Sequence, residues 1–132
     1  MIASRFIEIN WGDKDETYLL WRFCGDWTGE TYFNSMLQLW RLMDTKNHPL
    51  NLHIDMLESG KNPSNLATLI QAAIRKGDCN INRIIVISDD AFWKGTYEIT
   101  CRFNKAVAAL DVTFVESVEE AKHYQNQSEQ LS

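Results

Sequence analysis

The sequence predicts an α/β domain built on a mixed five-stranded sheet, mostly parallel, with an antiparallel hairpin at its edge. The first observation is the run Ile-Ile-Val-Ile at residues 84–87, which is β-branched throughout and has polar neighbours. A strand with one wet face alternates polar and apolar residues, so this run predicts a central strand buried on both faces. The second is the element order ββαβαβαβα, in which helices separate the later strands and imply parallel crossovers.

The chain opens with the predicted hairpin. Residues 5–11 alternate apolar and polar side chains, and residues 17–24 do the same. Because the polar segment 12–16 between them is too short for a crossover, the two strands must pair antiparallel. The first of them is therefore expected at an edge of the sheet.

A long helix is predicted from the break at residues 25–28 to about Asp44. Its apolar side chains cover an arc of roughly 220°, which is wider than one core-facing stripe requires. They are Tyr32, Phe33, Met36, Leu37, Leu39, Trp40, Leu42 and Met43. Either this helix lies deep in the protein, or one edge of it faces a partner.

The remaining elements follow in strict alternation. Residues 50–56 predict a strand with Asn51, His53 and Asp55 on one face. After a loop at residues 57–61, Asn62 caps a helix that ends at Gly77. The next helix spans residues 91–110, the last strand spans residues 111–116, and a capping box at residues 117–120 opens the final helix. About four helices are therefore expected, in one domain over residues 1–127 with a polar tail at residues 128–132.

Composition excludes some classes of protein. The chain has 132 residues, of which 45% are hydrophobic and 23% charged, with a net charge of −5. An acidic balance argues against nucleic-acid binding, which usually needs a basic surface. No apolar run reaches the ~20 residues of a membrane span. The three cysteines are odd in number and form no CxxC, which predicts free thiols in a reducing cytoplasm.

This order of elements resembles the STAS domain, the fold of bacterial anti-sigma-factor antagonists, over nearly the whole chain. Residues 23–26 are similar to the end of the family's second strand, and Asp55 to an aspartate near the end of another. Residues 62–69 stand where the family's Asp-Ser-Ser-Gly-Leu segment begins a helix, and residues 115–121 resemble its closing strand-to-helix turn. The aromatic hairpin and first helix look more like the branch that shares its fold with CRAL-TRIO lipid-binding domains.

The resemblance implies a non-enzymatic regulatory module that binds a partner protein. The family's phosphoacceptor serine would fall at Pro63 or Ser64, and Asn65 stands where the family has a glycine. Since proline cannot accept a phosphate, Ser64 is the acceptor that remains in this turn.

The candidate partner- or anion-binding site is the turn that begins this helix. Its residues are Asp55, Ser59, Asn62, Ser64 and Asn65. Open backbone amides at a helix N-terminus favour an anion or an added phosphate. Plain capping of the helix explains the same residues equally well.

A second candidate surface is Trp93 with Tyr97, which lie beside the core-facing stripe of their helix. Exposed aromatic side chains often mark contacts, so this pair is predicted to bind a partner protein or a second copy of the chain. The other tryptophans could line a ligand pocket, but core packing is preferred for Trp21 and Trp40.

Two functions of other classes stay open. One is binding of a small apolar, lipid-like ligand between the first helix and the hairpin. The other is metal-assisted hydrolysis by Asp55 and Asp89, whose carboxylates follow neighbouring parallel strands. His53 is interpreted as a hydrogen-bonded histidine of the sheet face. No catalytic residue, cofactor or bound metal is predicted.

Overall fold

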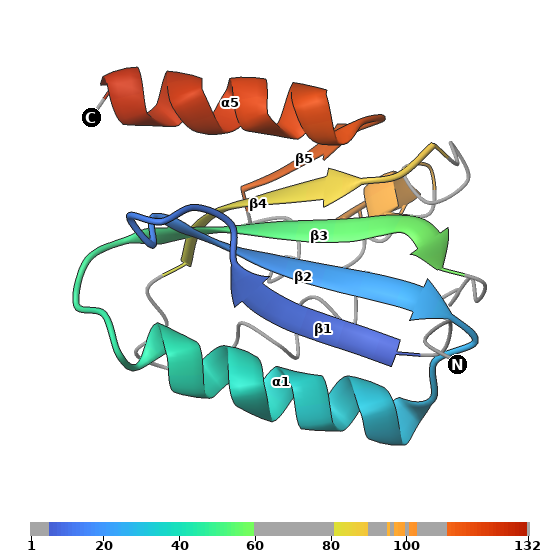
Figure 1. The fold of residues 1–132 in the computed structure, drawn as a ribbon. Helices are drawn as coiled ribbons and strands as arrows, with labels where there is room; N and C mark the ends of the chain where they lie inside the picture. The colour runs from blue at the N-terminus through green and yellow to red at the C-terminus, as the bar shows by residue number, and fades with distance from the viewer. Residues whose placement is uncertain are drawn as a thin grey trace.

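The computed structural model describes residues 6–59, 81–89, 95, 97–99, 101–102 and 111–131. Figure 1 shows five strands in one sheet, in the order β1-β2-β3-β4-β5. The elements are β1 (Phe6–Trp11), β2 (Tyr18–Gly25), α1 (Gly29–Met43), β3 (Leu50–Ser59), β4 (Ile81–Ile87), β5 (Val112–Val115) and α5 (Val118–Leu131). β1 pairs antiparallel with β2, and every other neighbouring pair is parallel. The predicted mixed sheet with an antiparallel edge hairpin is confirmed.

Part of the prediction falls outside the described residues. The helix expected after Asn62 lies there entirely. Of the helix expected at residues 91–110, residues 95, 97–99 and 101–102 are described, and they are helical.

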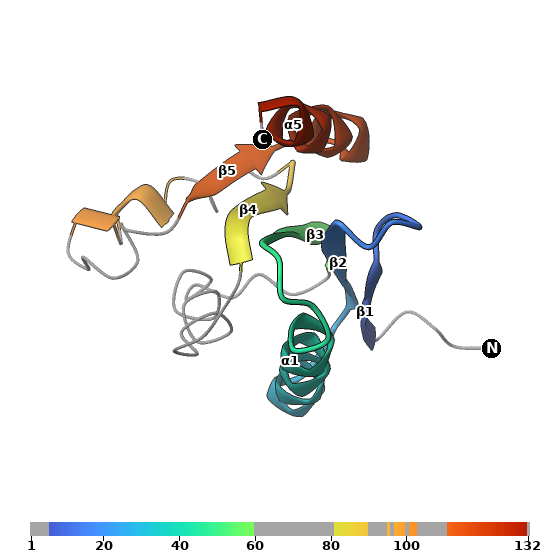
Figure 2. The ribbon, with the colours of Figure 1, turned by 90° about the vertical axis from the view of Figure 1, so that its left-hand side faces the viewer.

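Helices on opposite faces of the sheet explain the unbroken apolar run of β4. Ile84 and Val86 belong to the core cluster under α1, whereas Ile85 and Ile87 belong to the cluster under α5. Figure 2 shows these two helices on the two sides of the sheet. β4 pairs with both β3 and β5, so its interior position is confirmed, although the middle strand of the five is β3.

α1 is an amphipathic helix that lies on the surface. It begins after Thr28, whose hydroxyl accepts a hydrogen bond from the Thr31 backbone N–H at 3.1 Å. Its core-facing side chains are Tyr32, Ser35, Met36, Leu39 and Met43. Phe33 and Leu37 are exposed. The helix therefore does not lie deep in the protein, and one apolar edge of it is exposed; that this edge faces a partner stays a prediction.

β3 is longer than predicted. Residues 57–59 of the loop expected at residues 57–61 belong to the strand, because Glu58 and Ser59 still pair with Cys24 and Gly25 of β2 after a shift in register. Gly25 has a φ of 64°, a left-handed conformation that suits glycine and ends β2. The longer strand places Glu58 and Ser59 at the carboxyl end of β2, close to the start of α1.

α5 begins at the predicted capping box. The Glu120 backbone N–H donates to Ser117 Oγ at 3.1 Å, and the Glu120 carboxylate accepts from the Glu116 N–H at 3.0 Å. The helix continues to Leu131. It therefore runs through residues 128–131, for which the sequence predicts a polar tail. None of the described helices is long and apolar enough to cross a membrane.

Candidate functional site

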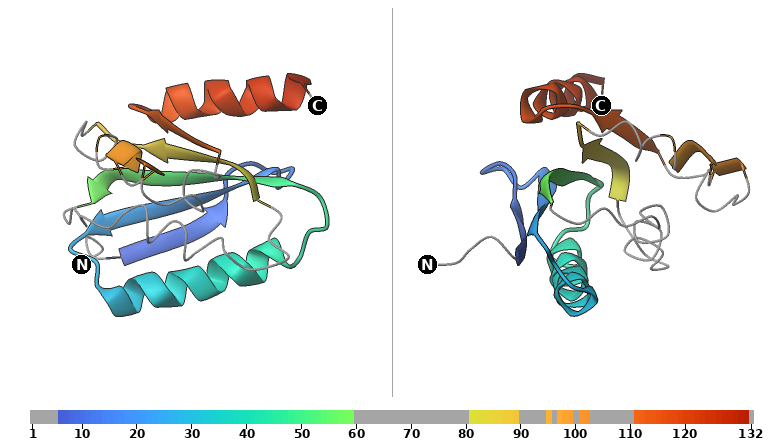
Figure 3. Two further views of the ribbon diagram at one scale, coloured as in Figure 1. Left: turned by 180° about the vertical axis from the view of Figure 1, so that it is seen from behind. Right: turned by 90° about the vertical axis from the view of Figure 1, so that its right-hand side faces the viewer.

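The carboxyl ends of β2 and β3 meet beside the beginning of α1, as Figure 3 shows (left). Arg22 of β2 forms ion pairs there with Glu58 of β3 and with Glu8 of β1, the latter at 3.4 Å. All three side chains are substantially exposed to water, so each pair stabilises the fold by at most ~1 kcal/mol. These charged side chains therefore determine the charge of the surface here and contribute little to the stability of the protein.

Ser59 ties the end of β3 to the segment before α1. The Trp27 indole Nε1–H donates a hydrogen bond of 2.8 Å to Ser59 Oγ. Of the predicted anion-binding turn, only Ser59 and Asp55 are described. Asn62, Ser64 and Asn65 lie outside the described residues, so a binding role for this turn stays a prediction.

Asp55 is buried, and its side chain forms a hydrogen bond with the backbone. Its Oδ1 accepts a hydrogen bond of 3.0 Å from the Leu57 N–H, two residues further along the chain. Asp89 is exposed at the end of β4. Among residues 6–59, 81–89 and the other described positions, no three acidic, histidine or cysteine side chains are grouped as metal ligands. The hydrogen bond to Leu57 lies within β3, beside the shift in its register with β2, and gives Asp55 a structural role.

A buried polar cluster lies between β3 and α5. Gln125 Oε1 accepts a hydrogen bond of 2.8 Å from Asn51 Nδ2 and lies 3.1 Å from His53 Nε2. Because an amide oxygen only accepts, His53 must carry a proton on Nε2 and donate it. The Tyr18 ring stacks on the imidazole, with ring centroids 4.1 Å apart. The interpretation of His53 as a hydrogen-bonded histidine of the sheet face is confirmed.

Burial sets the protonation of this histidine. It lowers the pKa of His53 from 6.5 to about 4, while the Gln125 hydrogen bond and the Asp13 charge raise it by less. The native imidazole is therefore neutral near pH 7. The cluster has the geometry of a structural contact that fixes α5 on the sheet.

The lowered pKa predicts a loss of stability in acid. Between pH 6.5 and 4 the unfolded chain binds a proton at His53 that the folded chain does not, so the free energy of unfolding should fall as the pH falls. The full loss, reached below pH 4, is about 3 kcal/mol for a shift of this size. Urea denaturation across this range measures it. His53→Gln should flatten the profile in this window, whereas exposed His48→Gln should not, and an unchanged slope in His53→Gln would contradict the assignment.

Four aromatic side chains from β2, α1 and the segment between them lie in the core. Trp21, Phe23, Trp27 and Tyr32 are all buried, and their neighbouring ring centroids lie 5.1–6.2 Å apart. The Trp21 indole N–H donates to Ser35 Oγ at 2.9 Å. The assignment of Trp21 to the core is confirmed, and Trp40 packs against the same cluster while remaining half-buried.

Tyr97 is buried, so the prediction that it forms an exposed pair with Trp93 is wrong for Tyr97. Its side chain is 6% exposed and lies edge-on to Phe114 of β5, with ring centroids 5.6 Å apart. The sequence could not show this because β5 and Tyr97 meet only in the folded sheet. Trp93 lies outside the described residues.

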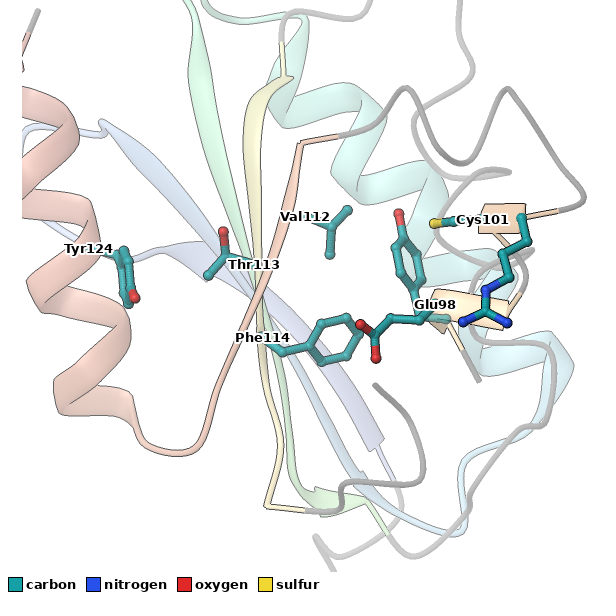
Figure 4. A pocket seen from close by; sticks show the side chains of 8 residues that line it. Glu98, Cys101, Val112, Thr113, Phe114 and Tyr124 are labelled. Atoms are coloured by element: carbon teal, nitrogen blue, oxygen red, sulfur yellow. The ribbon is translucent and has the colours of Figure 1, made fainter. Parts of the chain in front are cut away.

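An open cavity of about 600 Å³ follows the outer edge of β5 (Figure 4). Its walls come from both faces of the sheet. They include Tyr97, Cys101, Val112, Thr113, Phe114 and Tyr124. The exposed Glu98 and Arg102 also border it. Sequence reasoning did not identify this cavity, because its walls come from separate segments of the chain.

Comparison with known proteins establishes the fold. No family model and no curated protein sequence matches the chain. Its structure is similar to the crystal structure of an uncharacterized protein of the DUF3478 family, with a SpoIIAA-like fold, from Shewanella loihica PV-4. The two chains are 18% identical with a TM-score of 0.62, over 89% of this chain and 90% of the other. At that identity the likeness shows the fold alone: the chain has a SpoIIAA-like fold, as STAS domains do.

Proposed function

We propose that the protein is a non-enzymatic regulatory module that binds a partner protein through the outward face of α1. The fold supports this at the level of architecture, since it is shared with STAS domains. The observation that carries the proposal is a pair of exposed apolar side chains on a helix whose other face is fully committed to the core.

The pair is Phe33, 52% exposed, and Leu37, 40% exposed. Residues four apart on a helix are neighbours on its surface, so the two side chains form one continuous patch. The half-buried Trp40, three residues after Leu37, extends it toward the core. We call Phe33, Leu37 and Trp40 the outer stripe of α1. An amphipathic helix with such a stripe docks into an apolar groove of a partner.

Substitution of the outer stripe tests the proposal. Phe33→Asp combined with Leu37→Asp should weaken partner binding at least tenfold, because truncation of a central apolar contact typically costs more than 1 kcal/mol. The partner is first identified by cross-linking in native cells, and the purified pair is then titrated by calorimetry. Asn34→Asp combined with Gln38→Glu is the matched control, since these exposed polar neighbours lie outside the stripe.

Both double variants should melt close to the unsubstituted protein, because exposed substitutions rarely change stability by more than about 0.5 kcal/mol. Equal affinity of the stripe variant and the control would overturn the proposal. Phosphorylation at Ser64 and a cytoplasmic location belong to the same proposal. The free thiols of Cys24 and Cys101 fit a reducing compartment.

A second candidate function is the binding of a small apolar molecule. It is favoured by the cavity along β5, whose volume of about 600 Å³ falls within the usual range of ligand pockets. Aromatic rings of Tyr97, Phe114 and Tyr124 line it. This is a different place from the first helix and hairpin, where the sequence suggested such a pocket. Native mass spectrometry separates the two functions, because a retained small molecule favours this one.

A further inference from the structure

We infer that two copies of the chain associate through the outer edge of β5, with Thr113 opposite Thr113 on a twofold axis. The inference is independent of the outer stripe of α1, which lies on a different part of the fold. Its starting point is the direction of the backbone groups of β5.

β5 has one paired edge and one that no described strand covers. Toward β4, the Ile84 N–H donates to Asp111 O at 2.8 Å and the Ser88 N–H donates to Val115 O at 2.9 Å. Backbone direction alternates along a strand, so the intervening Thr113 also faces β4. The N–H and C=O groups of Val112 and Phe114 therefore point away from the sheet, toward the open cavity of Figure 4.

β5 is a short edge strand, four residues long, and its sequence holds no further protection against strand pairing. Natural edge strands are blunted by charged side chains, proline or bulges. The opposite edge of the sheet, β1, carries Glu8 in its middle. β5 reads Val-Thr-Phe-Val, without a charge, proline or glycine, and these residue types favour strand pairing. An edge of this composition is suited to receive another strand.

A second β5 can pair with this edge when Thr113 lies on the twofold axis. When Thr113 meets Thr113 in an antiparallel pair, Val112 lies opposite the partner's Phe114. These are the residues whose N–H and C=O groups point outward, so each such couple can exchange both of its hydrogen bonds. On the face of α1, Val112 then packs beside an aromatic ring, and on the face of α5 two threonines adjoin. Both are favourable cross-strand pairs.

The two charged side chains that border the cavity are also compatible with self-association. A twofold contact places a surface against itself, so a border of one sign would repel its copy. Glu98 and Arg102 border the cavity with one charge of each sign, and both are exposed. An extended segment of another protein could also pair with this edge. Such a segment would not place Thr113 opposite Thr113, so the test below distinguishes it from a second copy of the chain.

Charged substitutions of Thr113, the residue on the proposed twofold axis, test the inference. Thr113→Lys and Thr113→Glu each place like charges opposite one another, so each variant alone should sediment as a monomer where the unsubstituted chain sediments as a dimer. An equimolar mixture should regain the dimer, and native mass spectrometry should show that it contains one chain of each variant. This recovery also shows that both variants are folded. Asn10→Lys and Asn10→Glu on the β1 edge are the matched controls and should leave the dimer intact.

Three results would overturn the inference. They are a monomeric unsubstituted chain at every concentration, dimers of Thr113→Lys alone, and a mixture of the two variants that stays monomeric. The double variant Phe33→Asp with Leu37→Asp should remain dimeric. Failure of the proposed partner surface is therefore distinguishable from failure of this dimer.

Discussion

Replacement of Val86 by Asp should abolish cooperative folding. Val86 is fully buried in the cluster under α1, and its neighbour Ile85 is fully buried under α5. A carboxylate placed among the apolar side chains of this cluster loses its hydration, a cost of several kcal/mol. The lost packing of the valine adds to this cost. Because a domain of this kind is stable by only about 5–15 kcal/mol, the variant should be largely unfolded.

Circular dichroism and thermal denaturation measure this directly. Asn82→Asp is the matched control, since it introduces the same carboxylate into the same strand at an exposed position. It should melt cooperatively, close to the unsubstituted protein. A soluble Val86→Asp variant with a cooperative transition would show that β4 is not covered on the face of α1.

Replacement of Gln125 by Leu should cost roughly 2–6 kcal/mol of unfolding free energy. The leucine fills a similar volume but offers no acceptor to Asn51 Nδ2 or His53 Nε2. Each of these buried donors then loses its partner, at about 1–3 kcal/mol apiece. Urea denaturation should show a lower midpoint with an unchanged slope, because the surface exposed on unfolding stays the same.

The adjacent exposed residue of α5 supplies the control. Asn126→Leu places the same side chain on the outward face of the helix and should change stability by no more than about 0.5 kcal/mol. If Gln125→Leu lowers the free energy of unfolding as little as Asn126→Leu does, the polar cluster does not fix α5 on the sheet.

The strands and the first and last helices could be predicted because their signals are local. The apolar run at residues 84–87, the alternation on either side of the hairpin turn and the capping box at Ser117 each specify structure within a few residues. The wide apolar arc of α1 also indicated its exposed edge, although it left a deeply buried helix open as the alternative.

The features that the sequence did not predict depend on contacts between distant segments. Gln125 meets His53 across 72 positions of the chain, and no periodicity in either segment indicates that bond. Tyr97 is buried by Phe114, and β3 is prolonged by pairing with β2. The cavity along β5 requires the packing of three separate segments. Local pattern therefore predicted the scaffold, and tertiary packing determined the candidate surfaces.

The most direct test of the partner-binding claim is hydrogen–deuterium exchange of the chain alone and in complex with its partner. Binding through the outer stripe should slow amide exchange in α1, above all around Phe33 and Leu37, because docking suppresses the local opening of that helix. Exchange in the buried strand β4 should stay the same. Slowed exchange elsewhere in the chain, with α1 unchanged, would contradict the proposal that this helix is the docking surface.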